Sequence, residues 1–343
     1  MYCTELDHIG HIIQASPRTW LVTGNAGFIG SNLVEFLLTY GQTVIGLDNF
    51  STGHRYNIED VLSSVGKDAA ERFTFIEGDT ADFLTCTKAC DGVDIILHQA
   101  ALGSVPRSIE NPVRSNRSNI TGFLNILSAA QEAGIVRFVY ASSSSVYGDS
   151  PHLPKVEEHT GKLLSPYAVT KMTAELYGGV FASVYGMETI GLRYFNVFGR
   201  RQDPDGAYAA VIPKWIKSFL TEEDIYINGD GETSRDFTYI DNVIAANILA
   251  GITDNEEAYG EVFNIAAGGR NTLNELYKLI QDKLNNHLSS TIVQEPIYRD
   301  FRPGDIRHSN ADISKAKRLL DYTPTHDMYS GMEEAIEWYI GHI

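Results

Sequence analysis

The stretch TWLVTGNAGFIG, residues 19–30, decides the fold of this chain. Its first five residues form a short apolar run that predicts a buried strand. Gly24, Gly27 and Gly30 follow at regular spacing, and residues 31–38 then show a helical pattern. A glycine-rich turn between a strand and a helix is the context in which this spacing indicates a dinucleotide site.

The three glycines suit the backbone of such a site. Gly24 permits the tight turn, Gly27 lets the backbone approach a pyrophosphate, and Gly30 lets the helix pack closely on the strand. The amino terminus of the helix faces the phosphates with its partial positive charge. A strand–helix turn without a ligand is the alternative, but an acid, Asp48, ends the next predicted strand and favours a cofactor.

Asp48 also indicates which cofactor is bound. Its carboxylate can accept both ribose hydroxyls of an adenosine and would repel the 2′-phosphate of NADP, so NAD is favoured. The alternative is a loop aspartate that caps a turn. Asp79 follows the predicted strand at residues 73–78 and is placed to bind the adenine amino group. The sequence HQAA, residues 98–101, ends the next strand, and we expect His98 to be packed in the core and not a ligand.

The order of elements predicts an α/β fold. Apolar strands are expected at residues 19–23, 43–47, 73–76, 95–97, 138–141, 189–192 and 262–265. Helices lie between them, notably at residues 119–133 and 167–184. Because strands that alternate with helices form a parallel sheet, we expect a Rossmann-type doubly wound parallel sheet. After about residue 194 the loops lengthen, which indicates a smaller C-terminal α/β domain interleaved with the last strands.

The composition is that of a globular chain with a strong acidic excess. Hydrophobic residues make up 43% of it, charged residues 21%, and the net charge is -17, which argues against a general binder of nucleic acid or of anionic membranes. No apolar run approaches the roughly 20 residues of a membrane span. Residues 1–16 do not resemble a signal peptide, so we expect a cytoplasmic protein.

The three cysteines, Cys3, Cys86 and Cys90, do not suggest a disulfide framework. A zinc site at Cys86 and Cys90 is the alternative, but no second pair of ligands lies nearby in the sequence. We therefore expect reduced thiols and no bound metal.

Tyr167 and Lys171 are the candidate catalytic pair. Four residues apart on a predicted helix, their side chains leave from one face. An ammonium beside a phenol favours the phenolate, which is a usable base near neutral pH. A solvated helix face is the alternative. The serine run at residues 142–145 follows a predicted strand, at the sheet edge where ligands bind, and a hydroxyl there can bond the oxygen that Tyr167 deprotonates.

At this point the chain resembles the extended short-chain dehydrogenases/reductases, and within them the sugar-nucleotide 4-epimerases. The resemblance runs from about residue 19 to near the end of the chain, through TGNAGFIG, LDNFSTG, HQAA, SSSSVYG, YAVTK, LRYFNVFG and RPGD in that order. The segments ALGSVPRS, GRRQDP, AYAAVIPKW and INGDGETSRDF are similar to the bacterial UDP-N-acetylglucosamine 4-epimerase group.

The resemblance implies a mechanism. Tyr167 would remove the proton from the sugar O4 while C4 passes a hydride to the nicotinamide. Lys171 would bind the nicotinamide ribose and lower the pKa of Tyr167, and Ser143 would be the catalytic serine. The 4-keto sugar would then turn and take the hydride back on its other face, so NAD stays bound through the cycle.

The resemblance also implies the binding residues. The cofactor set is Gly24, Gly27, Phe28, Ile29, Gly30, Asp48, Asn49, Ser51, Thr52, Gly53, Asp79, Thr80, Gln99, Ala100, Ala101, Asn119, Tyr167, Lys171, Tyr194 and Val197. The substrate set is Gly103, Ser104, Ser143, Ser144, Ser145, Tyr167, Asn196, Val211, Trp215, Tyr226, Asn228, Arg235, Arg302, Asp305 and Ser309.

Within the substrate set, Arg235 and Arg302 match phosphate clamps and Asn196 a pyrophosphate contact; a guanidinium suits phosphate oxygens. Asp305 matches a residue near the uridine ribose. The residues that match positions around the uracil are Val211, Trp215, Tyr226 and Asn228. Ser309 stands where epimerases that exclude acetamido sugars carry a bulky tyrosine, so the resemblance implies room for a 2-acetamido group.

Some residues depart from the pattern. Asn25 replaces a small apolar residue, and Thr80 replaces an aliphatic one beside the adenine. Ser145 stands where related decarboxylases carry glutamate, and no Asp-Glu pair follows the serines as dehydratases require. Both of those chemistries are therefore disfavoured.

The resulting prediction is an NAD-dependent enzyme that interconverts UDP-N-acetylglucosamine and UDP-N-acetylgalactosamine. The alternatives are a glucose/galactose 4-epimerase, another sugar-nucleotide enzyme of the same fold such as a dehydratase, decarboxylase or reductase, or a non-catalytic dinucleotide sensor. We assign residues 1–196 plus about 236–267 to NAD and about 197–235 plus 268–343 to the UDP-sugar. The family's habit also implies a homodimer through helices 119–133 and 167–184; helices packed only on their own sheet are the alternative.

Overall fold

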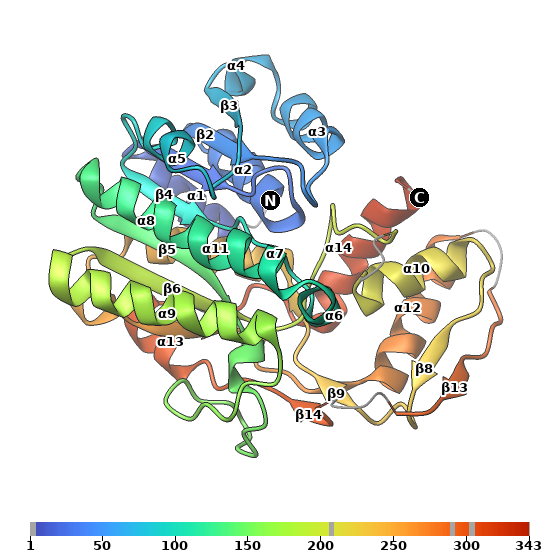
Figure 1. The fold of residues 1–343 in the computed structure, drawn as a ribbon. Helices are drawn as coiled ribbons and strands as arrows, with labels where there is room; N and C mark the ends of the chain where they lie inside the picture. Colours follow the sequence, from blue (N-terminus) through green and yellow to red (C-terminus); the bar gives the residue numbers. More distant parts are fainter. Residues whose placement is uncertain (1–4, 206–208, 289–291, 302–305, 343) are drawn as a thin grey trace.

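The fold is built on a parallel sheet in the computed structural model, which describes residues 5–205, 209–288, 292–301 and 306–342 (Figure 1). The sheet has seven strands in the order β11-β6-β5-β4-β1-β2-β3, and every neighbouring pair is parallel. The strands are β1 (Thr19–Thr23), β2 (Thr43–Asp48), β3 (Phe73–Glu77), β4 (Ile95–His98), β5 (Arg137–Ser143), β6 (Glu188–Tyr194) and β11 (Val262–Ile265). The predicted Rossmann-type sheet is confirmed.

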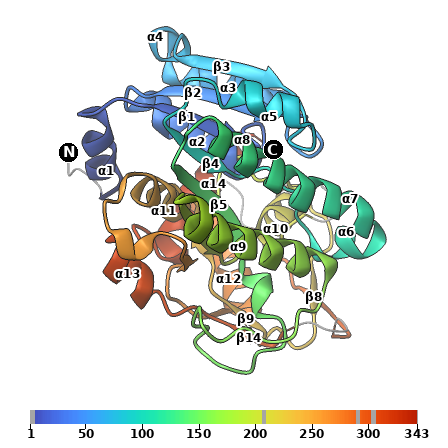
Figure 2. The same ribbon diagram turned by 60° about the vertical axis from the view of Figure 1, so that its left-hand side comes forward.

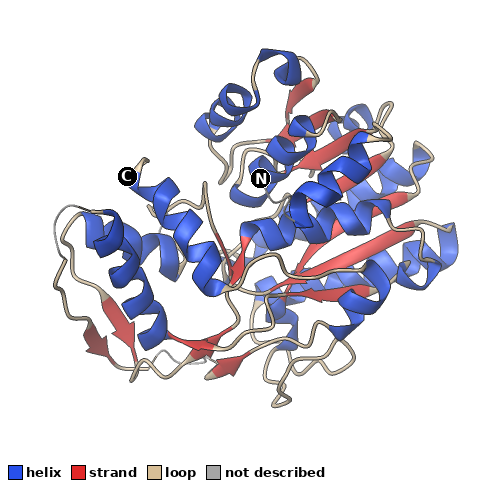
Figure 3. Ribbon diagram, turned by 180° about the vertical axis from the view of Figure 1, so that it is seen from behind, coloured by secondary structure: helices blue, strands red, loops and turns tan. Residues whose placement is uncertain are grey.

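Alternating side chains of the strands bury two separate faces. Val22 and Leu97 point into one core with helices α2 (Phe28–Thr39) and α11 (Ile240–Ile252). Leu21 and Ile96, their neighbours in the chain, point into the other core. Helices α5 (Phe83–Ala89), α8 (Gly122–Glu132) and α9 (Pro166–Tyr185) cover that second face. Figures 2 and 3 show helices on both sides of the strands, as a doubly wound sheet requires.

The C-terminal region lies beside the sheet (Figure 1). Its helices are α10 (Val211–Leu220), α12 (Leu273–His287), α13 (Ser314–Leu320) and α14 (Met328–Ile340). Its short strands are β7 (Val197–Phe198), β8 (Tyr226–Asn228), β9 (Ser234–Arg235), β10 (Thr238–Tyr239), β12 (Asn271–Thr272), β13 (Ile297–Arg299) and β14 (His308–Ser309). They pair as β10 with β7, β13 with β8, and β12-β9-β14. Whether the proposed domain boundaries coincide with separate functions stays a prediction.

The remaining elements are short. They are the helices α3 (Arg55–Val65), α4 (Lys67–Ala70), α6 (Val105–Glu110) and α7 (Pro112–Asn116), and the 3-10 turns at Ser144–Tyr147 and Glu256–Ala258.

Two helical features differ from the prediction. Helix α1 (Glu5–Gln14) was not expected; it buries Ile9 and Ile13, and Asp7 accepts a hydrogen bond from the hydroxyl of Tyr40. The helix predicted at 119–133 begins instead as a π-helical turn at Arg117–Thr121, and α8 follows it. Such turns often lie at functional sites.

The cysteines of α5 belong to the core. Cys86 and Cys90 are buried free thiols, and burial raises the pKa of both to about 12. Both therefore stay protonated near neutral pH. Across the described ranges, we find no helix with the length and apolar character needed to span a bilayer.

The close packing of α2 on β1 yields a stability prediction. A Cβ at Gly30 would lie 2.2 Å from the backbone oxygen of Gly24, and backbone cannot give way as a flexible side chain can. Gly30→Ala should lower the free energy of unfolding by about 2 kcal/mol in urea titrations.

Gly179, in α9, is the matched control. The nearest atom to its Cβ would be the oxygen of Gly260 at 3.9 Å. Gly179→Ala should therefore stabilise the protein by about 0.5–1 kcal/mol, because alanine favours a helix. Equal effects of the two substitutions would contradict this account of the turn.

Candidate active site

A cleft opens at the carboxyl ends of β1, β2 and β4, with a volume of about 350 Å³. It brings together most of the residues that the sequence assigned to the cofactor: Gly24, Gly27, Phe28, Ile29, Gly30, Asp48, Asn49, Ser51, Thr52, Gly53, Asp79, Thr80, Gln99, Ala100 and Ala101. Gly103, assigned to the substrate, lines it as well. Their gathering at one edge follows from the parallel sheet, whose strands all end there.

The glycine turn has little spare room. Gly24 has a positive φ of 70°, and a Cβ there would lie 2.8 Å from the backbone nitrogen of Ala100. The amide of Gly27 donates to the oxygen of Gly24 at 3.1 Å, and α2 begins at Phe28. The first amides of α2 therefore end at the cleft, where a pyrophosphate would find unpaired donors.

Asp48 is held in place by the backbone. Its carboxylate accepts the amides of Ala26 at 2.9 Å and Phe50 at 2.8 Å. The side chain is buried, and burial raises its pKa while these bonds oppose the rise. Asp79 likewise accepts the amide of Ala81 at 2.9 Å. Two acids fixed at the ends of neighbouring strands fit the ribose and the adenine of NAD.

Asn25 is the departure from the family pattern with a structural consequence. Its side chain is 1% exposed, and its amide finds no hydrogen-bond partner among the described residues. It lies against Gly46 of β2, where a Cβ would approach its nitrogen to 2.5 Å. Asn25 does not line the cleft, so direct contact between it and a cofactor is not indicated.

Ser143, Tyr167 and Lys171 meet at the next strand end. Tyr167 lies in the first turn of α9, which Ser165 caps, and its phenol lies near enough to Ser143, at the end of β5, for that side chain to favour the phenolate. Lys171 donates from Nζ to the oxygen of Ala141 at 2.7 Å and lies 5.9 Å from the centre of the Tyr167 ring. The structure thus brings the three catalytic candidates together.

The expected lowering of the Tyr167 pKa by Lys171 is not found. Burial raises the pKa of Tyr167, and only the side chain of Ser143 opposes the rise. Burial also lowers the pKa of Lys171 to about 8, against the charge of Glu175. The helix spacing gives the shared face but not the direction of the ammonium, which donates to the strand. The effect of Lys171 on the pKa of Tyr167 therefore stays a prediction.

A buried ion pair holds this corner together. Arg193 of β6 binds Glu175 of α9 through Nη2 and Oε2 at 2.8 Å, and Ser142 of β5 donates to the same carboxylate. Arg193 also donates to the hydroxyl of Tyr147 at 3.0 Å. Glu175 lies one helical turn beyond Lys171, so the pair fixes the catalytic turn of α9 against two strands.

Other predicted cofactor residues lie around this corner. Asn119, in the π-helical turn, donates to Thr170 at 3.1 Å, and Tyr194 donates to Gln99 at 3.1 Å. Val197 starts β7. His98 is 4% exposed and bonds Thr23, so it is packed as expected. Their contacts with NAD stay predictions.

The serines that follow β5 differ in their contacts. Ser143 accepts the amide of Ser145, and the buried hydroxyl of Ser145 has no partner in the described part of the chain. Ser144 begins the 3-10 turn. An unpaired hydroxyl beside the catalytic corner fits the predicted role of Ser145 near the hexose.

Arg235 and Ser309 lie side by side in the C-terminal region. They are paired in the parallel strands β9 and β14, so both side chains project to the same face. Asn196, before β7, has a positive φ of 35° and donates to the oxygen of Asp236 at 3.1 Å. Arg302 and Asp305 lie outside the described residues. Gly103 and Ser104 precede α6, and Asn228 ends β8.

Two of the residues predicted to lie around the uracil have ring contacts with other side chains of the protein. Trp215 is 4% exposed and packs edge-on against Tyr277, so its ring belongs mainly to the core. Arg299 lies over the ring of Tyr226, 3.2 Å from its centre. The predicted places of these two rings around the uracil stay predictions, and Val211, at the start of α10, is partly exposed.

The sequence did not single out several arginines of the site. Arg107 lines the cleft, and Arg270 donates to Ser234 at 3.0 Å, beside Arg235. Burial and then the charges of Arg270, Arg307 and Arg235 lower the pKa of His308. The acidic chain thus keeps a local positive region on β9 and β14. Residue spacing could not reveal it, because Arg235, Arg270 and Arg307 come from three separate segments of the chain.

Comparisons with known proteins agree with this geometry. A family model described as the NAD dependent epimerase/dehydratase family matches residues 20–266. A putative UDP-glucose 4-epimerase of Methanocaldococcus jannaschii is 36% identical over 324 residues, which cover 93% of this chain and 97% of the relative.

Two solved structures of sugar-nucleotide 4-epimerases superpose on this chain. The UDP-N-acetylglucosamine 4-epimerase from Methanobrevibacter ruminantium M1, in complex with UDP-N-acetylmuramic acid, superposes with a TM-score of 0.86 at 38% identity, covering 95% of this chain and 99% of the other. The UDP-glucuronic acid 4-epimerase from Bacillus cereus, in complex with UDP-glucuronic acid and NAD, gives 0.82 at 30%, covering 95% and 100%. The glycine turn, the fixed acids and the closeness of Tyr167 to Ser143 agree with these matches. The chain belongs to the NAD-dependent epimerase/dehydratase family, and its cofactor is NAD.

Proposed function

We propose that the protein is a UDP-sugar 4-epimerase whose preferred substrates are UDP-N-acetylglucosamine and UDP-N-acetylgalactosamine. The observation that carries the proposal is the contact between Tyr167 and Ser143 beside the NAD cleft. A phenol and a hydroxyl that lie this close to one another can both reach one substrate oxygen. Several relatives carry out 4-epimerisation by name, and they differ in the hexose.

The roles of the chain's own residues follow from their places. Tyr167 takes the proton from O4 of the sugar and returns it after the sugar has turned. Ser143 lies beside the Tyr167 phenol and opposes the rise of its pKa. Lys171 provides a cation at the same strand end. When bound, NAD supplies the acceptor and donor of the hydride at C4.

The nucleotide would be held by the C-terminal region. Arg235 offers a guanidinium to a diphosphate, and Arg270 and Arg307 add positive charge nearby. Asn196 lies between β6 and β7 in the chain and donates to the oxygen of Asp236, the residue after Arg235. The uridine would contact Val211 and Asn228; these contacts rest on the resemblance.

A preference for acetamido sugars is supported by small side chains. Ser309 lies beside Arg235 on the same face of the β9–β14 pair. Gly103 borders the cleft with nothing within 4 Å of where its Cβ would be. By the resemblance both residues would line the hexose site, and a tyrosine at residue 309 would fill part of it. The relative in complex with UDP-N-acetylmuramic acid, a larger amino sugar, agrees with a roomy site.

We also propose a homodimer through α8 and α9. Val169, Leu176, Val180 and Val184 lie along one side of α9 and are about half or more exposed. An apolar stripe of this kind is a candidate protein interface. Light scattering of the purified protein should give twice the 38.0 kDa mass of one chain, and a single-chain mass would contradict the proposal.

Tyr167→Phe tests the catalytic assignment. The substitution keeps the ring and removes the hydroxyl, so turnover of the UDP-sugar should fall by about 100-fold or more while binding of UDP and NAD persists. Tyr185→Phe, on the exposed part of the same helix, is the control and should turn over normally. Turnover of Tyr167→Phe within a few-fold of the wild type would refute the assigned base.

Ser309→Tyr tests the choice of hexose. The larger side chain should lower kcat/KM for UDP-N-acetylglucosamine by about tenfold relative to UDP-glucose, because pocket shape separates close analogues by about 1–3 kcal/mol. Ser314→Tyr, at the exposed start of α13, should change neither value. If Ser309→Tyr impairs both sugars equally, residue 309 does not sort them by size.

A further inference from the structure

The segment that joins the two halves of the site, residues 196–202, has an unusual backbone. Asn196 and Arg201 have positive φ angles of 35° and 66°, and Gly199 has one of 147°. Side chains rarely adopt such angles, and residues that do so persist only where the surroundings hold them. The contacts of Arg201 show what holds this segment.

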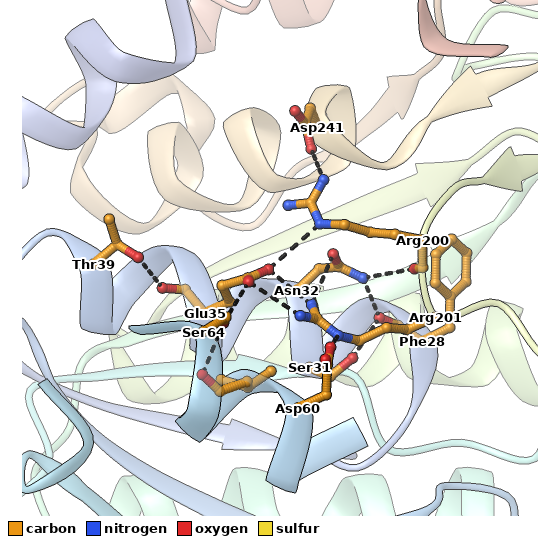
Figure 4. A network of polar contacts seen from close by, with 11 residues as sticks. Phe28, Ser31, Asn32, Glu35, Thr39, Asp60, Ser64, Arg200, Arg201 and Asp241 are labelled. Atoms are coloured by element: carbon orange, nitrogen blue, oxygen red, sulfur yellow. Dashed lines mark hydrogen bonds and ion pairs between the residues drawn. The ribbon is translucent and has the colours of Figure 1, made fainter. Parts of the chain in front are cut away.

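Arg201 is clamped by two helices of the cofactor half (Figure 4). Its Nη1 and Nη2 bind the two carboxylate oxygens of Glu35, on α2, at 2.8 and 3.0 Å. Its Nε binds Asp60, on α3, at 2.7 Å. The side chain of Arg201 is 3% exposed, so this fork-to-carboxylate contact is shielded from water.

A second bond joins the same helix to the backbone of the segment. Asn32 donates from Nδ2 to the oxygen of Arg200 at 3.1 Å and to the oxygen of Phe28 at 2.8 Å. Phe28 is the first residue of α2 and lines the NAD cleft. Figure 4 shows Phe28, Asn32 and the two arginines close together. A short run of contacts therefore connects the cofactor cleft with residues 200 and 201.

The rest of the segment is tied down from the other side. Tyr339, on α14, donates to the oxygens of Gly199 at 3.1 Å and Gln202 at 3.0 Å. Gln202 donates to the oxygen of Val197 at 3.0 Å. Arg200 also reaches Glu35, through Nε at 3.4 Å, but Arg201 is the residue of this segment that binds both α2 and α3 through its charge.

The clamp stays charged near neutral pH. Burial alone would raise the pKa of Glu35, but Arg201 and Arg200 lower it to about 2. Arg200 in turn binds Asp241 of α11 at 2.8 Å. The network therefore acts as a fixed support and not as a pH switch.

We propose that Arg201, held by Glu35 and Asp60, is a positioning residue that fixes residues 196–202 and so couples the NAD-binding helix α2 to the nucleotide-binding half of the site. The proposal rests on the UDP-sugar function proposed above. Arg201 touches no reacting atom; it acts through Asn196 and Val197, which it keeps in register with the cleft.

The test compares Arg201→Lys and Glu35→Gln with Arg137→Lys. Lysine keeps the positive charge at residue 201 and meets the same strain from the positive φ angle. The substitution therefore removes only the paired hydrogen bonds of the guanidinium to Glu35. Arg137 is a matched control: its buried guanidinium binds Glu188 at 2.7 Å and the oxygen of Gly251 at 2.9 Å, at the opposite end of β5. The readouts are the Kd for UDP by calorimetry, KM and kcat with UDP-N-acetylglucosamine, the melting temperature, and hydrogen exchange of peptides covering residues 194–205.

Arg201→Lys and Glu35→Gln should raise the Kd for UDP and the KM by about fivefold or more, with kcat changed less than threefold, because contacts to the nucleotide are made equally in the ground state and the transition state. Hydrogen exchange should rise in the peptides of residues 194–205. Arg137→Lys should lower the melting temperature without either effect.

An unchanged Kd for UDP in both clamp variants would overturn the proposal, as would equal weakening by Arg137→Lys. If the wild type itself bound no UDP, the proposed function would fail. The coupling between α2 and residues 196–202 would then be tested by hydrogen exchange alone. Unchanged exchange of residues 194–205 in Arg201→Lys would reject it.

Discussion

The close packing of α2 on β1 is the constraint on which both halves of the site depend. Gly30 lets the helix come within reach of the Gly24 backbone, so the first turn of α2 ends at the cofactor cleft. The same helix carries Asn32 and Glu35 on its far side, where they hold the loop that leads to the nucleotide site. A shift of α2 would therefore disturb the cofactor site and the substrate site together.

The catalytic corner depends on a second fixed arrangement. Glu175 and Arg193 are almost fully buried, and their pairing joins α9 to β6 while Ser142 joins the same carboxylate to β5. A buried ion pair of this kind costs desolvation, but it selects one geometry. Here the selected geometry places Tyr167 within hydrogen-bonding reach of Ser143. The acidic surface of the chain plays no part in this arrangement; the charges that matter are local and paired.

Much of the fold could be predicted from the sequence, because its signals are local. The apolar runs and the glycine turn specify β1 and α2 within short windows, and the alternation of strands with helices indicates a parallel sheet. Helix α1 was missed because only Ile9 and Ile13 mark its buried face. The π-helical turn was missed because Asn119 turns inward to bond Leu102 and Thr170, partners that lie far away in the chain.

The grouping of the predicted cofactor residues at one cleft follows from the sequence. The contacts between individual side chains of the site were harder to predict. The cofactor residues gather around one cleft because parallel strands all end at the same edge of the sheet. The direction of the Lys171 ammonium, the burial of Trp215 and the clamp between Glu35 and Arg201 depend on packing between distant segments, which spacing does not encode.

The central claim is that this chain, with NAD retained, inverts C4 of a UDP-linked amino sugar. The most direct measurement is proton NMR of the purified protein with UDP-N-acetylglucosamine and no added NAD. The account predicts that signals of UDP-N-acetylgalactosamine appear, and that the same final mixture is reached from either sugar. A product that keeps a 4-keto group, or no conversion of either sugar by protein shown to contain NAD, would contradict it.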